Sequence, residues 1–306
     1  METLLRRSFD AGSLPAPVLR HPHKQLVYEL AGPQTSGTIE VTRWRVTEVS
    51  AALHPTEIAA DPGYYEYGDD AATWHVNFAD PDLFVAYGSR LLAQDELQCA
   101  EHPALGSIRE ALGEHALTED DNGPTQVLIA GAERRCALAT APDLDAGRPY
   151  GLYGNRFAAA PPEHIRAAVA QVRPPTHTNL VAIAAPTGTG EYMRRTLENI
   201  TVTAYAGFAA AVHESARLWP GVPVEIRTGF WGCGAFGGNR LVMSSLQIFA
   251  ARLAGVARVR FYTADRAGRS ELFAGAALLE EAIAEGGDVI DNIADRDLRW
   301  GVSNGT

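Results

Sequence analysis

The chain has 306 residues, of which 46% are hydrophobic and 21% are charged. This balance is typical of a globular protein whose core is large enough to fold without disulfides or metals. The formal net charge of -11 disfavours a protein that grips the nucleic-acid backbone, since such binding needs a basic surface. Cys99, Cys136 and Cys233 are too few and too widely spaced for a disulfide framework or a zinc motif.

The N-terminus lacks the apolar core of a signal peptide, and no apolar run is long enough to cross a membrane. We therefore expect a cytoplasmic protein with no membrane partner. Residues 1–35 are rich in Pro, His and Gly without clear periodicity, and we expect them to form an N-terminal extension packed on a main domain of residues 36–306. His21 and His23 in this extension have no third ligand nearby, so surface positions are expected rather than a metal site.

Apolar residues alternate with polar ones, or cluster in short runs, in six segments that predict strands. These are residues 38–49, 73–79, 125–132, 179–186, 222–230 and 256–264. Helical spacing and end signals predict five helices between them. These are residues 91–103, 161–173, 191–218, 239–254 and 271–287. The alternation predicts an α/β fold with three layers, α/β/α, around a mixed central sheet.

The segment Thr228–Arg240, TGFWGCGAFGGNR, holds four glycines within seven residues between a predicted strand and a predicted helix. Glycine allows a ligand to approach the backbone closely, and exposed amides beside a helix N-terminus can bind an anion without charged side chains. The segment matches neither a Rossmann fingerprint nor a P-loop. A tight turn whose small residues serve packing alone is the alternative.

The second informative segment, Val76–Leu105, runs from a strand through a loop into a helix whose first turns carry Gln94, Asp95 and Glu96. Adjacent buried carboxyls raise each other's pKa, and a carboxyl that stays protonated near neutral pH can act as a general acid. Acids in the first turn of a helix can also simply complement its dipole. Both interpretations stay open from this segment alone.

Together and in this order, the two segments resemble the catalytic macrodomain of poly(ADP-ribose) glycohydrolases. Residues 76–80, VNFAD, correspond to that family's strand motif, and residues 94–96, QDE, correspond to its Gln-Glu-Glu motif. Residues 228–239 follow the family's TGNWGCGAFGGD loop almost letter for letter. The resemblance extends over roughly residues 73–265 and implies a macrodomain-type fold.

The resemblance also implies hydrolysis of an O-glycosidic bond of ADP-ribose with no metal and no cofactor. Glu96 takes the position of the general acid/base, and Asp95 that of the glutamate that helps to hold the ribose. Asp80 replaces an asparagine that contacts the distal ribose, and Gln94 belongs to the same binding motif. The loop residues expected to bind substrate, mainly the diphosphate, are Thr228, Gly229, Gly232, Cys233, Gly234, Ala235, Phe236, Gly237 and Gly238. Cys233 has no His or Asp beside it in sequence to activate it, which disfavours a nucleophilic role.

Departures from the family pattern bear on the substrate. Phe84-Val85-Ala86 replaces a triple-glycine loop, which predicts that bulky side chains intrude on the ligand. Tyr153 is the candidate for the tyrosine that clasps the ribose, and the family's adenine-stacking aromatic falls near Thr263, with Phe261 and Tyr262 beside it. These changes favour release of single ADP-ribose units over processive cleavage of a polymer.

The expected activity is therefore that of an ADP-ribosyl glycohydrolase acting on O-linked, mono-ADP-ribosylated targets. Its expected partners are ADP-ribose and ADP-ribosylated proteins, with ADP-ribosylated nucleic acid left open. The principal alternative is a non-catalytic macrodomain that reads ADP-ribose. A hydrolase of nucleotide sugars or of ADP-ribosylated bases is a third interpretation, since it would use the same pocket for another acceptor.

Overall fold

The computed structural model describes residues 1–305. Its longer strands form one sheet with the order β1-β2-β6-β7-β4-β8-β9-β3, and a short β5 pairs with β6. The strands are β1 (Glu2–Asp10), β2 (Thr38–Arg45), β3 (Glu57–Asp61), β4 (Thr73–Ala79), β5 (Glu119–Asp120), β6 (Gly123–Leu138), β7 (Val169–Ala184), β8 (Glu225–Thr228) and β9 (Arg258–Tyr262). The sheet is antiparallel from β1 to β7 and parallel from β7 to β3.

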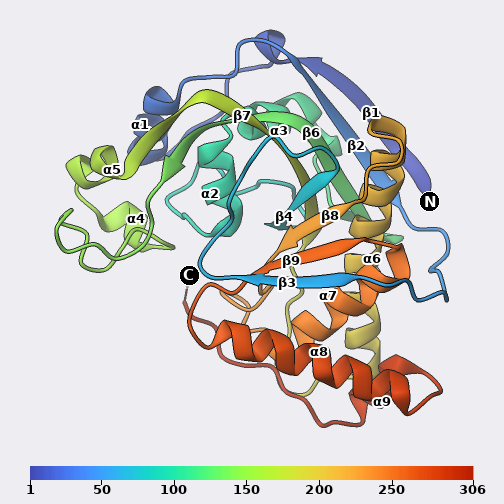
Figure 1. The fold of residues 1–306 in the computed structure, drawn as a ribbon. Helices are drawn as coiled ribbons and strands as arrows, with labels where there is room; N and C mark the ends of the chain where they lie inside the picture. The colour runs from blue at the N-terminus through green and yellow to red at the C-terminus, as the bar shows by residue number, and fades with distance from the viewer. Residues whose placement is uncertain (306) are drawn as a thin grey trace.

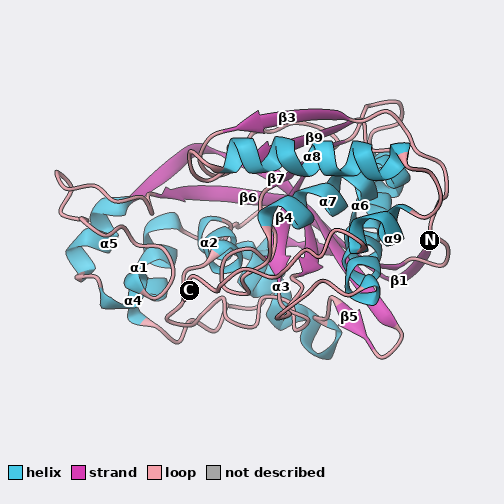
Figure 2. Cartoon of the chain, turned by 90° about the horizontal axis from the view of Figure 1, so that it is seen from below, coloured by secondary structure: helices cyan, strands magenta, loops and turns pink. Residues whose placement is uncertain are grey.

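Helices cover the sheet from both sides, which confirms the predicted mixed α/β fold (Figure 1). The helices are α1 (Pro22–Ala31), α2 (Gln94–Glu101), α3 (Ala104–Leu112), α4 (Arg156–Ala159), α5 (Pro162–Ala168), α6 (Arg194–Leu218), α7 (Arg240–Ala254), α8 (Gly268–Ala284) and α9 (Val289–Ala294). Figure 2 shows α1, α4 and α5 at one end of the molecule beside the long strands β6 and β7, while α6, α8 and α9 lie toward the other end.

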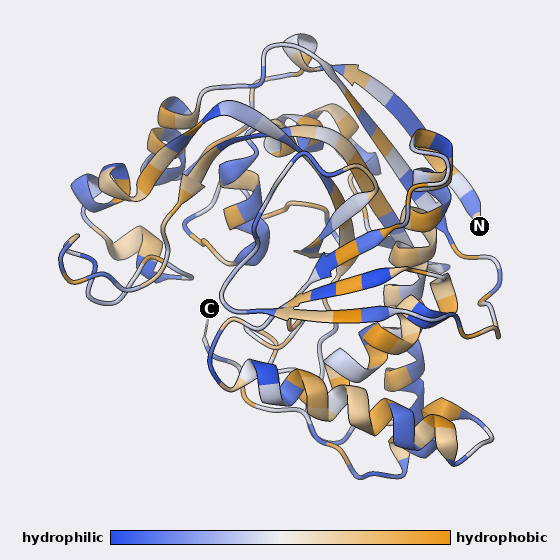
Figure 3. Ribbon diagram, viewed as in Figure 1, coloured by the Kyte–Doolittle hydropathy of each residue, from blue (hydrophilic) through white to orange (hydrophobic). Residues whose placement is uncertain are grey.

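Two hydrophobic clusters lie on opposite faces of the sheet. Trp74 and Val76 of β4 pack in the larger cluster with residues of α6, α7 and α8. Val127 of β6 faces the other way and packs in the second cluster with residues of α3. Neighbouring residues of one strand enter different clusters because side chains alternate across a sheet. Figure 3 shows the same alternation as orange and blue bands along β8, β9 and β3.

Several predicted elements agree closely with the structure. The strand predicted at residues 73–79 has the bounds of β4, and the helix predicted to end near Pro103 ends at Glu101. Gly255 ends α7 with φ of +74° and ψ of +29°, the left-handed cap that glycine favours.

The helix predicted over residues 161–173 is wrong beyond Ala168, where β7 begins. Residues 169–171 pair with 136–138 of β6, so partner hydrogen bonds outweigh the local helical pattern. Residues 2–10, expected to lack regular structure, form the edge strand β1, which pairs with β2. The boundary predicted at residues 35/36 stays a prediction, but part of the N-terminal segment belongs to the central sheet.

Candidate active site

The site begins on β4 just beyond the residues that pair with β8. β8 pairs with β4 only over Thr73, Trp74 and His75, so the next backbone groups of β4 need other partners. The side-chain amide of Gln94 supplies them: its Nε2 donates to the Val76 carbonyl at 3.0 Å, and its Oε1 accepts from the Phe78 N–H at 2.8 Å. Gln94 therefore fixes the start of α2 against the edge of β4.

Asp95 and Glu96 follow in the first turn of α2 and are 6% and 4% exposed. Glu96 turns back toward the helix N-terminus, where its Oε2 accepts from the Ala93 N–H at 2.9 Å. Asp95 turns toward β4, where its Oδ1 accepts from Asn77 Nδ2 at 2.9 Å. The two carboxyls are thus neighbours in sequence with different hydrogen-bond partners.

Burial is the main cause that raises the pKa of Asp95 to about 7, and the charge of Glu96 adds to the rise. The Asn77 hydrogen bond, the charge of Lys24 and the Cys99 thiol act in the opposite direction and lower that pKa. Asp95 therefore titrates near neutral pH, which is unusual for an aspartate.

Asn77 connects the acids to a second glutamine. Its Nδ2 donates both to Asp95 and to Gln98 Oε1, each at 2.9 Å, and the Asn77 side chain is fully buried. Within residues 1–305, the Asn77 Oδ1 and the Gln98 Nε2 have no hydrogen-bond partner. Sequence analysis did not single out Gln98, although its position four residues after Gln94 places both amides on one face of α2.

The glycine loop follows β8 and ends where Asn239 caps α7 by accepting from the Leu241 N–H at 3.0 Å. Gly232 and Gly237 have φ of +74° and +66°, which glycine adopts most easily. Six amide N–H groups of the loop have no acceptor in the part of the chain that the structure describes. They belong to Gly229, Phe230, Gly232, Gly234, Ala235 and Phe236.

The chain's last described residues lie over this loop. The Gly301 N–H donates to the Gly237 carbonyl at 2.7 Å, and the Asn304 N–H donates to the Gly234 carbonyl at 3.2 Å. A Cβ atom on Gly237 would lie 2.8 Å from the Ser303 nitrogen, so only glycine fits there without a shift. Thr228 and Trp231 are fully buried beneath the loop, and the Trp231 Nε1 has no partner within residues 1–305.

The two motifs meet at Phe78. Its backbone N–H is held by Gln94, and its ring lies against Gly229, where a Cβ atom would be 3.6 Å from Phe78 Cζ. Tyr153 lies close enough to Glu96 for that charge to add to the burial that raises the Tyr153 pKa. The Tyr153 ring stacks on Tyr64, with centroids 6.1 Å apart. The structure therefore brings the acidic motif, the glycine loop and the candidate tyrosine together.

Other expected residues are placed differently. Phe84 does not intrude as predicted, because its side chain is fully buried in the second hydrophobic cluster while Val85 is exposed. The backbone of Phe84 has φ of +58°, a conformation that favours glycine. Asp80 is exposed, and its Oδ1 accepts from the Asp82 N–H at 3.0 Å. Phe236 is 40% exposed at the outside of the glycine loop.

The aromatic residues near Thr263 do not form an open stacking surface. Thr263 is buried, so no adenine ring can stack on it. Its N–H and hydroxyl both donate to the Asp61 carbonyl, at 2.9 and 3.1 Å. Phe261 packs against Phe230 in the core, with ring centroids 5.1 Å apart. Tyr262 packs against Tyr65 at 5.2 Å.

Cys233 and the N-terminal histidines have structural surroundings. Burial raises the pKa of the Cys233 thiol, which disfavours the reactive thiolate. His23 is buried, not a surface residue as predicted, and its Nδ1 lies 2.9 Å from the Phe157 carbonyl.

Within the described residues, no group of three or more His, Cys, Asp and Glu side chains is placed to hold a metal ion. No helix of residues 1–305 is long and apolar enough to span a membrane.

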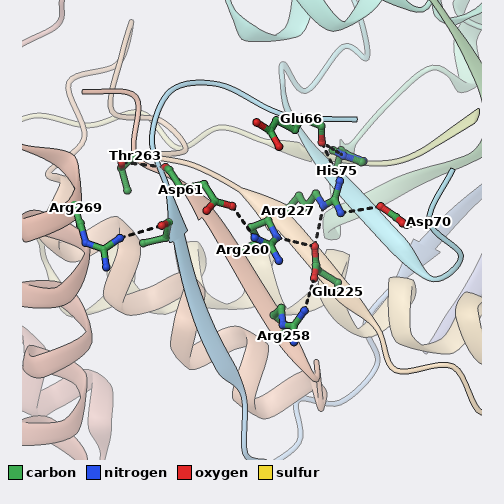
Figure 4. Close-up of polar contacts among 11 residues, drawn as sticks. Asp61, Glu66, Asp70, His75, Glu225, Arg227, Arg258, Arg260, Thr263 and Arg269 are labelled. Atoms are coloured by element: carbon green, nitrogen blue, oxygen red, sulfur yellow. Dashed lines mark hydrogen bonds and ion pairs between the residues drawn. The ribbon is translucent and has the colours of Figure 1, made fainter. Parts of the chain in front are cut away.

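Charged side chains of β8, β9 and β3 form one polar network (Figure 4). Glu225 bonds to Arg227 at 2.8 Å, to Arg260 at 3.0 Å and to Arg258 at 3.3 Å, while Arg260 also bonds to Asp61 at 2.6 Å. Each guanidinium already meets a carboxylate, so the network leaves little free positive charge for an anionic ligand.

A cleft of about 400 Å³ lies away from this site, beside the beginning of β4. It is lined in part by Asp69, Asp70, His177 and Trp219. Asp70 pairs with Arg227 at 2.8 Å, and Asp69 Oδ1 accepts a hydrogen bond from the His177 backbone N–H. The acids of this cleft therefore already have partners.

Comparison with known proteins shows which family part of the chain resembles. Residues 150–270 match the family model described as poly(ADP-ribose) glycohydrolase, macro domain fold. This range includes the whole glycine loop. The predicted resemblance to poly(ADP-ribose) glycohydrolases is confirmed over this range. The macrodomain-type fold predicted from the two motifs is confirmed with it.

Solved structures give more distant likenesses. The poly(ADP-ribose) glycohydrolase of Thermomonospora curvata bound to the inhibitor ADP-HPD is 16% identical, with 89% of this chain and 84% of that chain covered and a TM-score of 0.45. The Deinococcus radiodurans enzyme in complex with ADP-ribose is 12% identical, with 90% and 94% covered and a TM-score of 0.45. No curated protein matches the chain.

Proposed function

We propose that the chain is an ADP-ribosyl glycohydrolase that releases single ADP-ribose units from O-linked acceptors. The match of residues 150–270 to a glycohydrolase family supports a hydrolase of ADP-ribose glycosidic bonds. The observation that carries the proposal is the meeting of both motifs at Phe78, which Gln94 holds from one side and Gly229 contacts from the other. A nucleotide diphosphate on the glycine loop would present its adjoining ribose to the beginning of α2.

In this mechanism the free amides of Gly232, Gly234, Ala235 and Phe236 hold the diphosphate. The other residues of this mechanism's binding site surround the diphosphate; they are Asp80, Thr228, Gly229, Cys233, Gly237 and Gly238. Gln94 is a positioning residue, because both ends of its amide are bonded to β4.

Glu96 is the general acid/base of this mechanism. Its carboxyl protonates the departing acceptor oxygen while the C1″–O bond breaks and C1″ gains positive charge. The resulting carboxylate then removes a proton from the water that attacks C1″, so the hydroxyl joins C1″ and Glu96 regains its proton. Asp95, which holds a proton in a substantial share of molecules at neutral pH, helps to keep the acid pair from carrying two negative charges.

Two observations support single units over a polymer. Thr263 stands buried where the family places an aromatic ring, so one stacking contact with a nucleotide is missing. Val85 is exposed in the loop where the family has glycines. Fewer binding contacts favour a small substrate that is released after one cleavage.

A non-catalytic reader is the alternative that the Phe84-Val85-Ala86 loop favours, because it replaces glycines. Phe84 keeps the backbone conformation of a glycine and buries its ring in the core, which removes much of that objection. The retained acid pair at the beginning of α2 supports the enzyme instead.

The proposal is tested by incubating the protein with serine-linked and glutamate-linked mono-ADP-ribosylated protein and with ADP-ribose polymer. Released ADP-ribose is quantified, and binding of free ADP-ribose is measured by calorimetry. We expect binding and faster release from a mono-ADP-ribosylated protein than from the polymer. Binding without release from any of the three would favour the reader, and the absence of both would reject the proposed function.

A further inference from the structure

The chain contains a single lysine, Lys24, and all the other members of its 26 basic residues are arginines. Lys24 lies on α1, in the segment that sequence analysis treated as an extension. Its side chain is buried, being only 3% exposed, and its ammonium reaches the backbone of α2. A chain that uses arginine everywhere else thus places its one lysine beside the candidate catalytic acids.

The contacts of Lys24 tie three segments together. Its Nζ donates to the Tyr87 carbonyl at 2.9 Å and to the Glu96 carbonyl at 3.5 Å, and it lies 5.7 Å from the centre of the Phe157 ring. Both hydrogen bonds that Nζ makes within residues 1–305 go to backbone carbonyls rather than to a carboxylate. Lys24 is therefore a buried cation that acts on Asp95 and Glu96 through space, while its hydrogen bonds hold the backbone.

We propose that Lys24 is a positioning residue that holds the first turn of α2 and sets the pH range in which the Asp95–Glu96 pair carries a single proton. The proposal rests on the proposed function for its catalytic meaning, whereas the link between the three charges can be measured without any activity. Lys24 is distinguished from a residue that only fills the core by its effect on the protonation of the acids.

The electrostatic link runs in both directions. Burial lowers the pKa of Lys24 to about 8, and the charges of Glu96, Cys99 and Asp95 oppose this by raising it. In return, the charge of Lys24 lowers the pKa of Asp95 against the rise that burial and Glu96 cause. Removing the ammonium should therefore make Asp95 hold its proton to higher pH.

Other titratable groups around Lys24 are few. At the N-cap of α1 is His21, whose pKa is lowered by burial and then by neighbouring cations including Lys24. On α1 itself is Tyr28, which lines a small cavity together with Lys24. From the loop before α2, Tyr87 lies against Lys24, and its hydroxyl donates to Glu110 of α3 at 2.8 Å. Burial is the largest cause that raises the Tyr87 pKa, so this phenol stays neutral near pH 8.

The space at Nζ suits an ammonium better than a guanidinium. A cavity of about 20 Å³ adjoins Lys24, Tyr87 and Cys99, which is room for about one water molecule. Gly106 lines the same cavity, and a Cβ atom there would lie 2.5 Å from the Tyr87 ring. An ammonium is a compact charge with three donors, whereas the planar guanidinium needs more space and keeps its charge at every accessible pH.

Because Lys24 is the only lysine, labelling the protein with [¹³Cε]lysine gives one lysine signal, which can be titrated without any activity assay. We expect a midpoint near pH 8, which falls by roughly half a pH unit or more in Asp95→Asn or Glu96→Gln because a negative neighbour is lost. Glu101→Gln is the matched control, a buried acid of the same helix that should leave the midpoint unchanged. A midpoint near pH 10.4, or one indifferent to both acids, would overturn the proposal.

The second experiment compares the pH profiles of ADP-ribose release for the wild type, Lys24→Met and Lys24→Arg. One limb of the pH profile has its midpoint at the pH where the Asp95–Glu96 pair titrates, and we expect Lys24→Met to move this limb to higher pH. A purely structural role of Lys24 would lower activity and leave the limb in place. Lys24→Arg restores the wild-type position of the limb to the extent that it folds. If the protein releases no ADP-ribose, the lysine titration still shows whether Lys24 and the two acids influence each other. A failure of the proposed function is thus distinguished from a failure of the proposed role of Lys24.

Discussion

At the scale of single residues, Asp95 and Glu96 show how neighbours in sequence come to differ. Asp95 faces a buried amide and a thiol, whereas Glu96 caps the helix to which both belong. The adjacency of two acids could be read from the sequence, and so could their place at the beginning of a helix. Which of them turns toward Asn77 depends on how α2 docks on β4, and the sequence carries no local signal for that.

The unusual pKa of Asp95 predicts a pH-dependent cost to stability. The pKa in the folded state, about 7, is raised above its ordinary value, so folding favours the protonated form. The contribution of Asp95 to stability is therefore greatest at acid pH and is lost as pH rises through about 7. Asp95→Asn imitates the protonated form, and we expect its Tm to exceed that of the wild type by several degrees at pH 8.5.

The same comparison at pH 4.5 should show little difference between the two proteins, because both then carry a neutral side chain. Thermal unfolding followed by circular dichroism at the two pH values measures this. A Tm of Asp95→Asn equal to or below that of the wild type at pH 8.5 would contradict the account.

Gly237 gives a second prediction at the residue scale, because it combines φ of +66° with close contact to Ser303. Gly237→Ala should lower the free energy of unfolding by about 1–3 kcal/mol and weaken ADP-ribose binding. Gly221→Ala is the matched control, since Gly221 has φ of +81° but open space around its Cβ position. Calorimetry should find normal ADP-ribose affinity for the control, and an equal loss in both variants would refute a specific role of the loop.

At the scale of elements, the parts predicted well are those with a strong local pattern. β4 and the beginning of α7 follow from alternation and from a capping residue, which act within a few residues. β1 was missed because its partner, β2, lies some thirty residues away in the chain. The place of Lys24 could not be predicted for a related reason, because its partner on α2 lies far away in the chain. That Lys24 is the only lysine was nevertheless visible in the sequence.

An ion pair ties the edge strand β1 to α6. Arg6 donates to both oxygens of Glu214 at 2.7 and 2.9 Å, and the Glu214 side chain is only 2% exposed. Arg217 also bonds to Glu214, so a partner remains if Arg6 is lost. Arg6→Met should therefore cost about 1–3 kcal/mol of unfolding free energy, less than leaving a buried charge with no partner.

The double variant Arg6→Met/Glu214→Leu tests whether the charge causes that loss. We expect it to be more stable than Arg6→Met alone, because no carboxylate then stays buried without its strongest partner. Urea unfolding of the wild type, both single variants and the double variant gives the coupling energy. Strictly additive losses would show that the pair contributes nothing specific to docking β1.

At the scale of the whole molecule, one sheet joins the two halves of the chain. The antiparallel strands carry the N-terminal segment, and the parallel strands end at the edge where the acidic motif and the glycine loop meet. This edge is where ligands bind in open α/β sheets. Since the net charge is -11, the proposed diphosphate site relies on backbone amides rather than on a positive surface.

We propose that Glu96 performs the chemistry at this edge. The most direct measurement compares ADP-ribose release by the wild type, Glu96→Gln and Glu101→Gln, with ADP-ribose binding measured on the same samples. Glu101 is a matched control because it is buried on the same helix but bonds to Arg134 at 3.0 Å and to the Leu138 N–H at 2.7 Å. We predict that Glu96→Gln binds ADP-ribose yet loses release by a factor of roughly 10² or more, while Glu101→Gln keeps release wherever it folds. Release by Glu96→Gln at the wild-type rate would contradict the account.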